Sequence, residues 1–281
     1  MDENLVHTLQ HVLRTVIKNT IPLSGGDINE VYLLETGAGK FVLKKNSSSR
    51  YPGMFSAEAE GLNLLAASGA IHIPSVITRG EVGDDAYLVL EYIESGSPAS
   101  DFWQVFGRQL ATLHGNTAVA FGLEEANYIG SLPQYNERRT QAVEFYVTQR
   151  LQPQFRMAYN QGYRFACDKL YKNLDNIIPS EAPALVHGDL WNGNYLVGAD
   201  GHPCLIDPAV AYNHRETDMA MMALFGGFPG EVTDAYNEVF PLYEGWKDRM
   251  DVWQLYYLLV HLNLFGSGYH LGVKRIVEKY S

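Results

Sequence analysis

The apolar pattern of this chain changes from short β-like runs to mainly helical spacing at one small, polar segment, residues 94–100. A strand alternates with period 2 and a helix with period 3.6, so the two halves must build their cores differently. The chain has 281 residues, enough for two lobes that each bury a core. The sequence therefore predicts an α+β protein with a small lobe over residues 1–93, a linker over 94–100 and a mainly helical large lobe over 101–281.

The expected small lobe contains two helices and two β-hairpins. Helical spacing after the capping residue Asp2 predicts a helix that continues through Ile17 and ends before Pro22. A second helix is predicted over residues 55–67. The hairpins are expected over residues 28–45, with a turn at 37–39, and over residues 75–91, with a turn at 83–85. Such hairpins would form a small antiparallel sheet.

In the expected large lobe, one short hairpin interrupts a series of helices. The hairpin strands are residues 195–197 and 204–206, joined by a turn at 198–201. Helical spacing is found over residues 101–114, 141–171, 216–224, 232–240 and 249–265, with a break expected at Pro153.

Net charge and cysteine content exclude several classes of function. The 32 acidic and 21 basic side chains leave a net charge of −11, with no basic block, so nucleic acid and anionic membranes are not expected partners. Cys167 and Cys204 lack the spacing of zinc ligands or of a disulfide framework. The amino terminus does not have the pattern of a secretory signal, and polar residues interrupt the most apolar stretch. We expect a cytoplasmic protein with free thiols.

The polar residues around the large-lobe hairpin form the most informative motif. Residues 185–208 read LVHGDLWNGNYLVGADGHPCLIDP, in which Asp189 and Asn194 precede the hairpin and Asp207 follows it. A hairpin brings its two ends together, so the three side chains can meet. Phosphoryl transfer needs such a set, because a carboxylate orients the attacking hydroxyl while hard oxygen ligands hold Mg²⁺ against the nucleotide phosphates. Each residue alone is also an ordinary turn former, but the combination favours the functional interpretation.

The same stretch resembles a known family of enzymes. The chain is similar to the fructosamine kinases, also called ketosamine-3-kinases, in HGDLWNGN at residues 187–194 and in LIDPAVAYNHRETDMAMMALFGGF at residues 205–228. This family is a branch of the aminoglycoside-phosphotransferase and protein-kinase-like group. Further matching segments are GGDINEVYLLET, FVLKKN, MFSAEAEGLNLL, YIGSLPQYN and FYVTQRLQPQ, so the resemblance covers nearly the whole chain. It implies a bilobal protein-kinase-like fold with ATP between the lobes.

The resemblance also implies how the nucleotide is held. Lys44 matches the strand lysine that contacts the α- and β-phosphates, and Glu58, on the next helix, matches its ion-pair partner. The charges of Lys44 and Glu58 suit these roles, because an ammonium stabilises phosphate and a carboxylate can orient the ammonium. Lys45 is the alternative to Lys44, since alternation along a strand lets only one of the two face the cleft.

Two backbone segments complete the expected nucleotide site. Gly25 and Gly26 stand between the first helix and the first strand, where their N–H groups can meet phosphate, although a glycine pair is also common in plain turns. Glu91, Tyr92 and Ile93 follow the last small-lobe strand and match the hinge whose backbone groups bind adenine.

The resemblance places the acceptor site close in sequence to the catalytic set. Trp191, His214 and Glu216 are the residues expected to bind a sugar ring and a protonatable amine by stacking and charge. The alternative is structural, with Trp191 as a packing residue and His214 as a solvated turn residue. His261 lies in an apolar helical stretch and is expected to be a core histidine.

The resemblance implies an ATP- and Mg²⁺-dependent kinase that phosphorylates the sugar 3-hydroxyl of ketosamines, the fructose or ribulose adducts of lysine or small amines. Asp189 would orient that hydroxyl, Asn194 and Asp207 would bind Mg²⁺, and Lys44 would hold the nucleotide. Two alternatives stay open. One is a kinase of the same fold for another acceptor, such as an aminoglycoside, choline or homoserine, and the other is a nucleotide-binding module without turnover.

Overall fold

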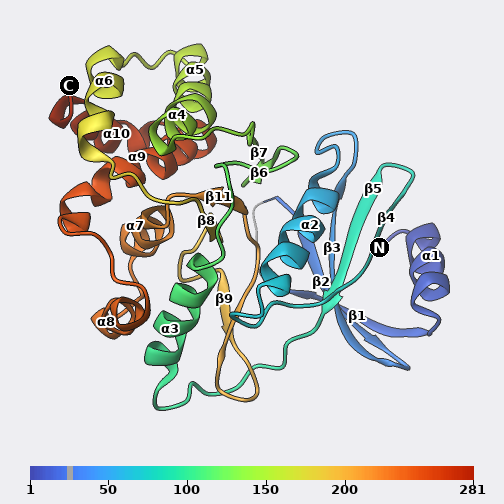
Figure 1. Cartoon of the computed structure of the whole chain (residues 1–281). Coiled ribbons are helices and arrows are strands. Elements are labelled where there is room, and N and C mark those ends of the chain that lie inside the picture. The colour runs from blue at the N-terminus through green and yellow to red at the C-terminus, as the bar shows by residue number, and fades with distance from the viewer. Residues whose placement is uncertain (24–27) are drawn as a thin grey trace.

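The computed structural model describes residues 1–23 and 28–281, and its two lobes confirm the predicted α+β, bilobal fold. Figure 1 shows the five-stranded sheet of the small lobe on one side of the molecule and the helices of the large lobe on the other. The amino terminus lies beside the sheet, and the carboxyl terminus lies among the helices at the far end.

The small lobe is built on one antiparallel sheet with the strand order β1-β2-β3-β5-β4. Its strands are β1 (Ile17–Leu23), β2 (Glu30–Thr36), β3 (Gly39–Ser47), β4 (Val76–Val82) and β5 (Asp85–Glu91). Alternation along β5 gives the sheet two apolar faces. Val89 packs with α1 (Glu3–Leu13), whereas Leu88 and Leu90 pack with α2 (Met54–Ala67). Figure 1 shows α1 on the outer side of the sheet and α2 on the side toward the large lobe.

The first helix is shorter than the sequence predicts. It ends at Leu13, because Arg14 adopts the left-handed conformation (φ 52°) and its N–H bonds back to the last turn. The chain then enters β1 at Ile17, so the prediction of a helix through this residue is wrong. Pro22 is accommodated because β1 is an edge strand, where a missing N–H need not break the ladder.

Helices make up most of the large lobe, as the apolar spacing predicts. They are α3 (Phe102–His114), α4 (Ala142–Phe145), the π-helical η1 (Tyr146–Leu151), α5 (Gln152–Asn160), α6 (Asp168–Ile177), α7 (Glu216–Phe225), α8 (Gly230–Val239), α9 (Trp246–Phe265), the 3₁₀ turn η2 (Ser267–Tyr269) and α10 (His270–Lys279). The expected break at Pro153 is wrong. The helical run continues from α4 through the π-helical η1 into α5, with Pro153 as the second residue of α5, and it breaks at residues 161–167 instead. The π-helical turns before Pro153 already depart from the i→i−4 hydrogen-bond pattern, so a missing N–H is accommodated there.

Three pairs of short strands complete the large lobe. They are β6 (Asn127–Ile129) with β7 (Leu132–Gln134), β8 (Ala184–Val186) with β11 (Ala211–Asn213), and β9 (Tyr195–Val197) with β10 (Pro203–Leu205). Only the β9–β10 hairpin is predicted by the sequence. All six strands are three residues long, too short for a period to show, and the β9–β10 hairpin is predicted because the turn at residues 198–201 joins its two apolar strands.

One apolar core connects the lobes. It joins Leu62 of α2 and Leu88 of β5 to Phe106 of α3 and to Leu205 and Val210 beside the β9–β10 hairpin. The segment between β5 and α3 is also tied to this hairpin, because Gly96 N–H donates to Val197 O (3.0 Å) and Ala99 N–H donates to Gly201 O (3.1 Å). The lobes are therefore held in a defined relation. Among the described residues, no helix is both long and apolar enough to cross a membrane.

The contact between α3 and α8 depends on Gly107. A Cβ at this position would lie 2.2 Å from Val232 O of α8, which is backbone and cannot rotate away. Alanine ordinarily stabilises a helix interior by about 0.5–1 kcal/mol relative to glycine. We predict that Gly107→Ala instead lowers the free energy of unfolding by about 1–3 kcal/mol. Gly272→Ala in α10 is the control, because its Cβ would have its nearest neighbour at 3.6 Å and should stabilise. Urea unfolding of both variants tests this, and equal gains would contradict it.

Candidate active site

A lysine on the central part of the sheet joins the small lobe to the large lobe. Lys44 of β3 stands opposite Leu88 in the β3–β5 ladder, on the face that packs against α2. Its Nζ lies 2.6 Å from Glu58 Oε1 of α2 and 3.0 Å from Asp207 Oδ1 of the large lobe. Only 7% of the Lys44 side chain is exposed. Burial alone would lower the pKa of Lys44, but the charges of Asp207 and Glu58 outweigh burial and raise it, so the ammonium stays charged.

Lys45 is excluded from this cleft by the alternation of the strand. It stands opposite Tyr87, on the other face of the sheet. Its ammonium lies 3.1 Å from Asp85 and 3.2 Å from Glu30, both within the small lobe. Lys44 is therefore the lysine that faces the large lobe.

Two nested strand pairs bring Asp189, Asn194 and Asp207 together. The β8–β11 pair forms an outer ladder and the β9–β10 hairpin forms an inner one, and residues 187–194 and 206–210 run between them. Because the two ladders fix both ends of these segments, residues thirteen to eighteen positions apart in sequence become neighbours. The order of the three residues around the hairpin is therefore explained by this nesting.

The amide of Asn194 connects the two aspartates of the motif. Its Nδ2 donates to Asp189 O (2.8 Å) and to Asp189 Oδ2 (3.1 Å), and lies 3.4 Å from Asp207 O. All three partners are acceptors, which fixes the amide with its NH₂ toward them and leaves Oδ1 as the free oxygen. Asp207 adopts the left-handed conformation (φ 55°), which aspartate tolerates better than most residues, and 46% of its side chain is exposed.

Asp189 has the properties of a group poised to exchange a proton near neutrality. Burial raises its pKa to about 7, the negative charge of Asp207 adds to the rise, and the hydrogen bond from Asn194 opposes it. A general base works best when its pKa lies near the working pH. A bound cation beside Asp207 would lower the pKa of Asp189 by cancelling the nearby negative charge.

The loop that carries Asp189 is held by a buried carboxylate of α7. Asp218, buried at the start of α7, accepts hydrogen bonds from His187 N–H (2.7 Å) and Gly188 N–H (2.8 Å). Burial would raise its pKa, but the hydrogen bond from His114 and the other contacts outweigh burial and lower it. Gly188 must be glycine, because its φ is 84° and a Cβ would lie 2.0 Å from Ala209 O.

Two clefts meet at Asp189. The interlobe cleft has a volume of about 560 Å³ and is lined by residues of both lobes, among them Lys44, Glu58, Asp189, Trp191, Asn194 and Asp207. The aromatic cleft has a volume of about 430 Å³ and lies within the large lobe. It shares with the first cleft the residues Gly130, Asp189, Trp191, Leu264 and Phe265. Trp191 is 39% exposed, so its ring is available at the junction and is not a core residue.

The oxygen atoms of the interlobe cleft fit Mg²⁺ only together with a nucleotide. The exposed carboxylate of Asp207 and the free Oδ1 of Asn194 are hard ligands of the type that Mg²⁺ prefers. No cluster of three or more His, Cys, Asp or Glu side chains suited to a metal ion occurs among the described residues. Mg²⁺ commonly uses one or two protein ligands and takes the others from phosphate and water, so this donor set suits a metal that arrives with ATP.

The predicted hinge residues follow β5 directly. Glu91 is fixed by Ser75, whose N–H (3.0 Å) and Oγ (2.8 Å) both bond to Glu91 Oε2. Ile93 is buried, and Tyr92 is half-buried below the ammonium of Lys40 at 5.3 Å. Their role as an adenine-binding hinge stays a prediction. The predicted phosphate-binding residues 25 and 26 lie outside the described residues.

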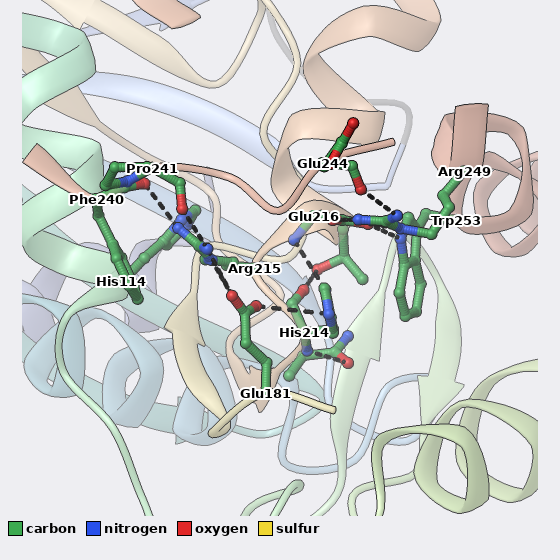
Figure 2. Close-up of polar contacts among 12 residues, drawn as sticks. His114, Glu181, His214, Arg215, Glu216, Phe240, Pro241, Glu244, Arg249 and Trp253 are labelled. Carbon is green, nitrogen blue, oxygen red and sulfur yellow. Dashed lines mark hydrogen bonds and ion pairs between the residues drawn. The ribbon is translucent and has the colours of Figure 1, made fainter. Parts of the chain in front are cut away.

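Two of the predicted acceptor residues, His214 and Glu216, are buried and belong to a structural network (Figure 2). Glu216 is 1% exposed and accepts hydrogen bonds from Arg249 Nη2 (2.5 Å) and Trp253 Nε1 (2.8 Å). His214 is 0% exposed, and its ring stacks on that of Trp253 with the ring centroids 4.7 Å apart. Neither lines the two clefts described above, so the prediction that they bind the acceptor is wrong.

The same network explains why these residues could not be assigned from sequence. His214 Nε2 lies 3.5 Å from Glu181 Oε2, and Glu181 also binds the neighbouring Arg215 at 2.5 Å. Figure 2 shows Arg215, Glu181, His214 and Glu216 following one another across the view toward Arg249 and Trp253. Their partners come from residues more than thirty positions away, so polar side chains near the motif are buried by distant elements.

Comparisons with known proteins agree with this geometry. The model of the fructosamine kinase family matches residues 1–281, the full chain. The chain belongs to the fructosamine kinase family. A probable ketoamine kinase of Enterococcus faecium is 39% identical over 268 residues, which cover 92% of this chain and 94% of the relative. The chloroplastic protein-ribulosamine 3-kinase of Arabidopsis thaliana is 35% identical over 92% of this chain and 81% of its own.

A solved structure shows the same arrangement of the fructosamine kinase fold. The crystal structure of a candidate fructosamine-3-kinase from Thermobifida fusca superposes with a TM-score of 0.88 and 34% identity, over 99% of this chain and 98% of that one. The resemblance expected from the motifs is thereby confirmed at the level of family and fold.

The pKa of Asp189 links its ionisation to stability. Because the folded pKa is raised above the ordinary value of 3.8, the folded state holds this proton more tightly, and stability is lost as the pH rises from about 4 to about 7. We predict that Asp189→Asn stabilises the nucleotide-free protein and that the gain grows over this pH range and is constant above it. Thermal unfolding from pH 4 to 8.5 measures this. Exposed Asp175→Asn is the control, and a pH-independent gain for Asp189→Asn would contradict the assignment.

The network of Figure 2 gives a second prediction. Glu216→Gln leaves Arg249 without its carboxylate in a largely buried place, so we expect the free energy of unfolding to fall by about 3–5 kcal/mol. The KM for the acceptor should stay within about twofold, because Glu216 does not line either cleft. Glu124→Gln breaks an exposed ion pair with Arg138 and should cost less than about 1 kcal/mol. A Glu216→Gln variant with unchanged stability and a raised KM for the acceptor would contradict this and would support the expectation that Glu216 binds the acceptor.

Proposed function

We propose that this protein transfers the γ-phosphoryl group of ATP to the sugar 3-hydroxyl of a ketosamine. One observation carries the proposal: Asp189 lies at the junction of the interlobe cleft and the aromatic cleft. Lys44, Asn194 and Asp207 line the interlobe cleft but not the aromatic cleft. A phosphoryl donor and an alcohol acceptor must approach from two sides of one catalytic group. The junction at Asp189 supplies this arrangement.

The nucleotide side of the site supplies charge and position. Lys44 would bind the nucleotide phosphates, and its ion pair with Glu58 holds the ammonium in place. Asn194 Oδ1 and the carboxylate of Asp207 would hold Mg²⁺, which when bound neutralises charge on the phosphates. Phosphoryl transfer through a loose transition state needs little covalent help, so most of the catalytic effect would come from these fixed charges.

On the acceptor side, Asp189 would accept a hydrogen bond from the attacking hydroxyl and take its proton as the bond to phosphorus forms. The hydrogen bond from Asn194 to Asp189 Oδ2 fixes the carboxylate and leaves Oδ1 for the hydroxyl. Trp191 would cover one face of the sugar ring.

Membership of the fructosamine kinase family supports a ketosamine as the acceptor. The Arabidopsis relative is a protein-ribulosamine 3-kinase, which supports the 3-hydroxyl as the site of transfer. Phosphorylation at this position would labilise the adduct and free the amine, so the reaction would serve deglycation. We further place the reaction in the cytoplasm, a proposal supported by two free cysteines.

A panel of acceptors tests this function. We predict ADP release with fructose- and ribose-derived ketosamines of lysine, and none with choline, homoserine or an aminoglycoside. Asp189→Asn should retain ATP binding while turnover falls by about 10²–10⁴-fold, because the proton acceptor is lost. Coupled ADP release and calorimetric titration with ATP measure the two properties. Turnover of another acceptor alone, or ATP binding without any turnover by the wild-type protein, would contradict the proposal.

A further inference from the structure

The aromatic cleft differs in chemistry from the interlobe cleft that it meets. Asp189 lies at their junction, and the rings of Trp191, Phe225, Phe265 and Tyr269 contribute to the lining of the aromatic cleft. None of the described residues that line it is a lysine or an arginine. Phosphate and carboxylate ligands need such cations, whereas aromatic faces and a carboxylate favour a cation. The cleft is therefore suited to a group with positive charge.

His261 of α9 adds a hydrogen-bond acceptor to this cleft. Its Nδ1 lies 2.8 Å from Tyr257 O, and because a carbonyl only accepts, Nδ1 must carry the proton. Burial lowers the pKa of His261, which keeps the ring neutral. In a neutral ring protonated at Nδ1, Nε2 is an acceptor, and no described residue donates to it.

Aromatic rings surround His261 on several sides. The ring centroids of Phe225, Tyr269 and Phe265 lie 4.9, 5.0 and 5.5 Å from that of His261. Clusters of aromatic rings are the usual binding sites for alkylammonium groups, which combine positive charge with apolar surface. A lone acceptor nitrogen among such rings matches an ammonium that carries N–H groups.

The distance between the reacting hydroxyl and the amine of a ketosamine fits the junction of the clefts. Only the carbons C3, C2 and C1 separate O3 from the amine nitrogen, so at bond lengths near 1.5 Å the two atoms are at most about 5 Å apart. A sugar whose 3-hydroxyl meets Asp189 must therefore place its amine beside this residue. On the side away from the nucleotide, that position is the mouth of the aromatic cleft.

We propose that the aromatic cleft is the subsite for the protonated amine of the acceptor and that His261 Nε2 accepts a hydrogen bond from this amine. The proposal rests on the proposed function. It replaces the expectation that His261 is a core histidine, because this side chain lines the cleft with one nitrogen free. The alkyl chain on the amine then follows the apolar side of the cleft along Val260 and Leu264. His261 is thus a specificity-determining residue that favours alkylammonium carriers over acceptors with an anion beside the amine.

A matched pair of acceptors tests the subsite. One is the N-butyl ketosamine of fructose, and the other is the butyl ether at the same carbon, which has the same length but no charge and no N–H. For His261→Leu we expect the KM of the ketosamine to rise about tenfold, the KM of the ether to change little, and the KM of ATP to stay unchanged. Phe225→Leu, which keeps the nitrogen and removes one ring, should raise the KM of the ketosamine more than that of the ether. His7→Leu, on the exposed face of α1, is the matched control.

The outcomes separate this proposal from the proposed function. If the wild-type protein turns over no ketosamine, the proposed function fails and this subsite fails with it. If the wild-type protein turns over the ketosamine but both variants keep its preference over the ether, the subsite alone is overturned. Equal losses for both acceptors and for ATP, together with a lowered melting temperature, would also overturn it, because they would show that His261 and Phe225 only support the fold.

Discussion

The ion pairs of Lys44 are the interaction on which the site depends. One ammonium on β3 bonds to Glu58 of α2 and to Asp207 of the large lobe, so a single buried cation fixes a helix and a loop from different lobes. Breaking a buried pair of this kind is costly because an unpaired charge remains inside the protein. In the proposed function, the same cation would bind the nucleotide phosphates. The ammonium of Lys44 would therefore both hold the lobes together and provide the charge that binds the nucleotide.

In the large lobe, the ionised carboxylate of Asp189 lowers stability. Asp189 is held on a loop that Asp218 and Gly188 fix in one conformation, close to the charge of Asp207. Burial and this neighbouring charge disfavour its ionised form, which costs stability at neutral pH and gives the carboxylate affinity for a proton. Active sites commonly trade stability for reactivity in this way. The two clefts that meet at Asp189 show where that reactivity would be directed.

Much of the motif was predictable because it is local. Asp189, Asn194 and Asp207 flank a hairpin, and two ladders of backbone hydrogen bonds bring them together. Lys44 needed one further fact, the register of β3 against β5, which the sequence alone left open between two lysines. His214 and Glu216 were assigned to the acceptor site because they lie close to the motif in sequence. This assignment is wrong because Glu181 and residues of α9 bury both side chains. The end of the first helix was decided by the backbone conformation of Arg14 and by strand pairing, which outweigh apolar spacing. The helix continues past Pro153 directly after the π-helical η1, which a rule based on proline alone does not anticipate.

The central claim is that these residues direct phosphate to one hydroxyl of a ketosamine. The most direct test is ¹³C and ³¹P NMR of the product formed from a fructose-derived ketosamine labelled with ¹³C at the third carbon of the sugar. The account predicts a new phosphate ester in which the labelled carbon couples to phosphorus and the proton attached to that carbon also couples to phosphorus over three bonds. A phosphate attached to any other position, or a labelled carbon that shows no coupling while ADP accumulates, would contradict it.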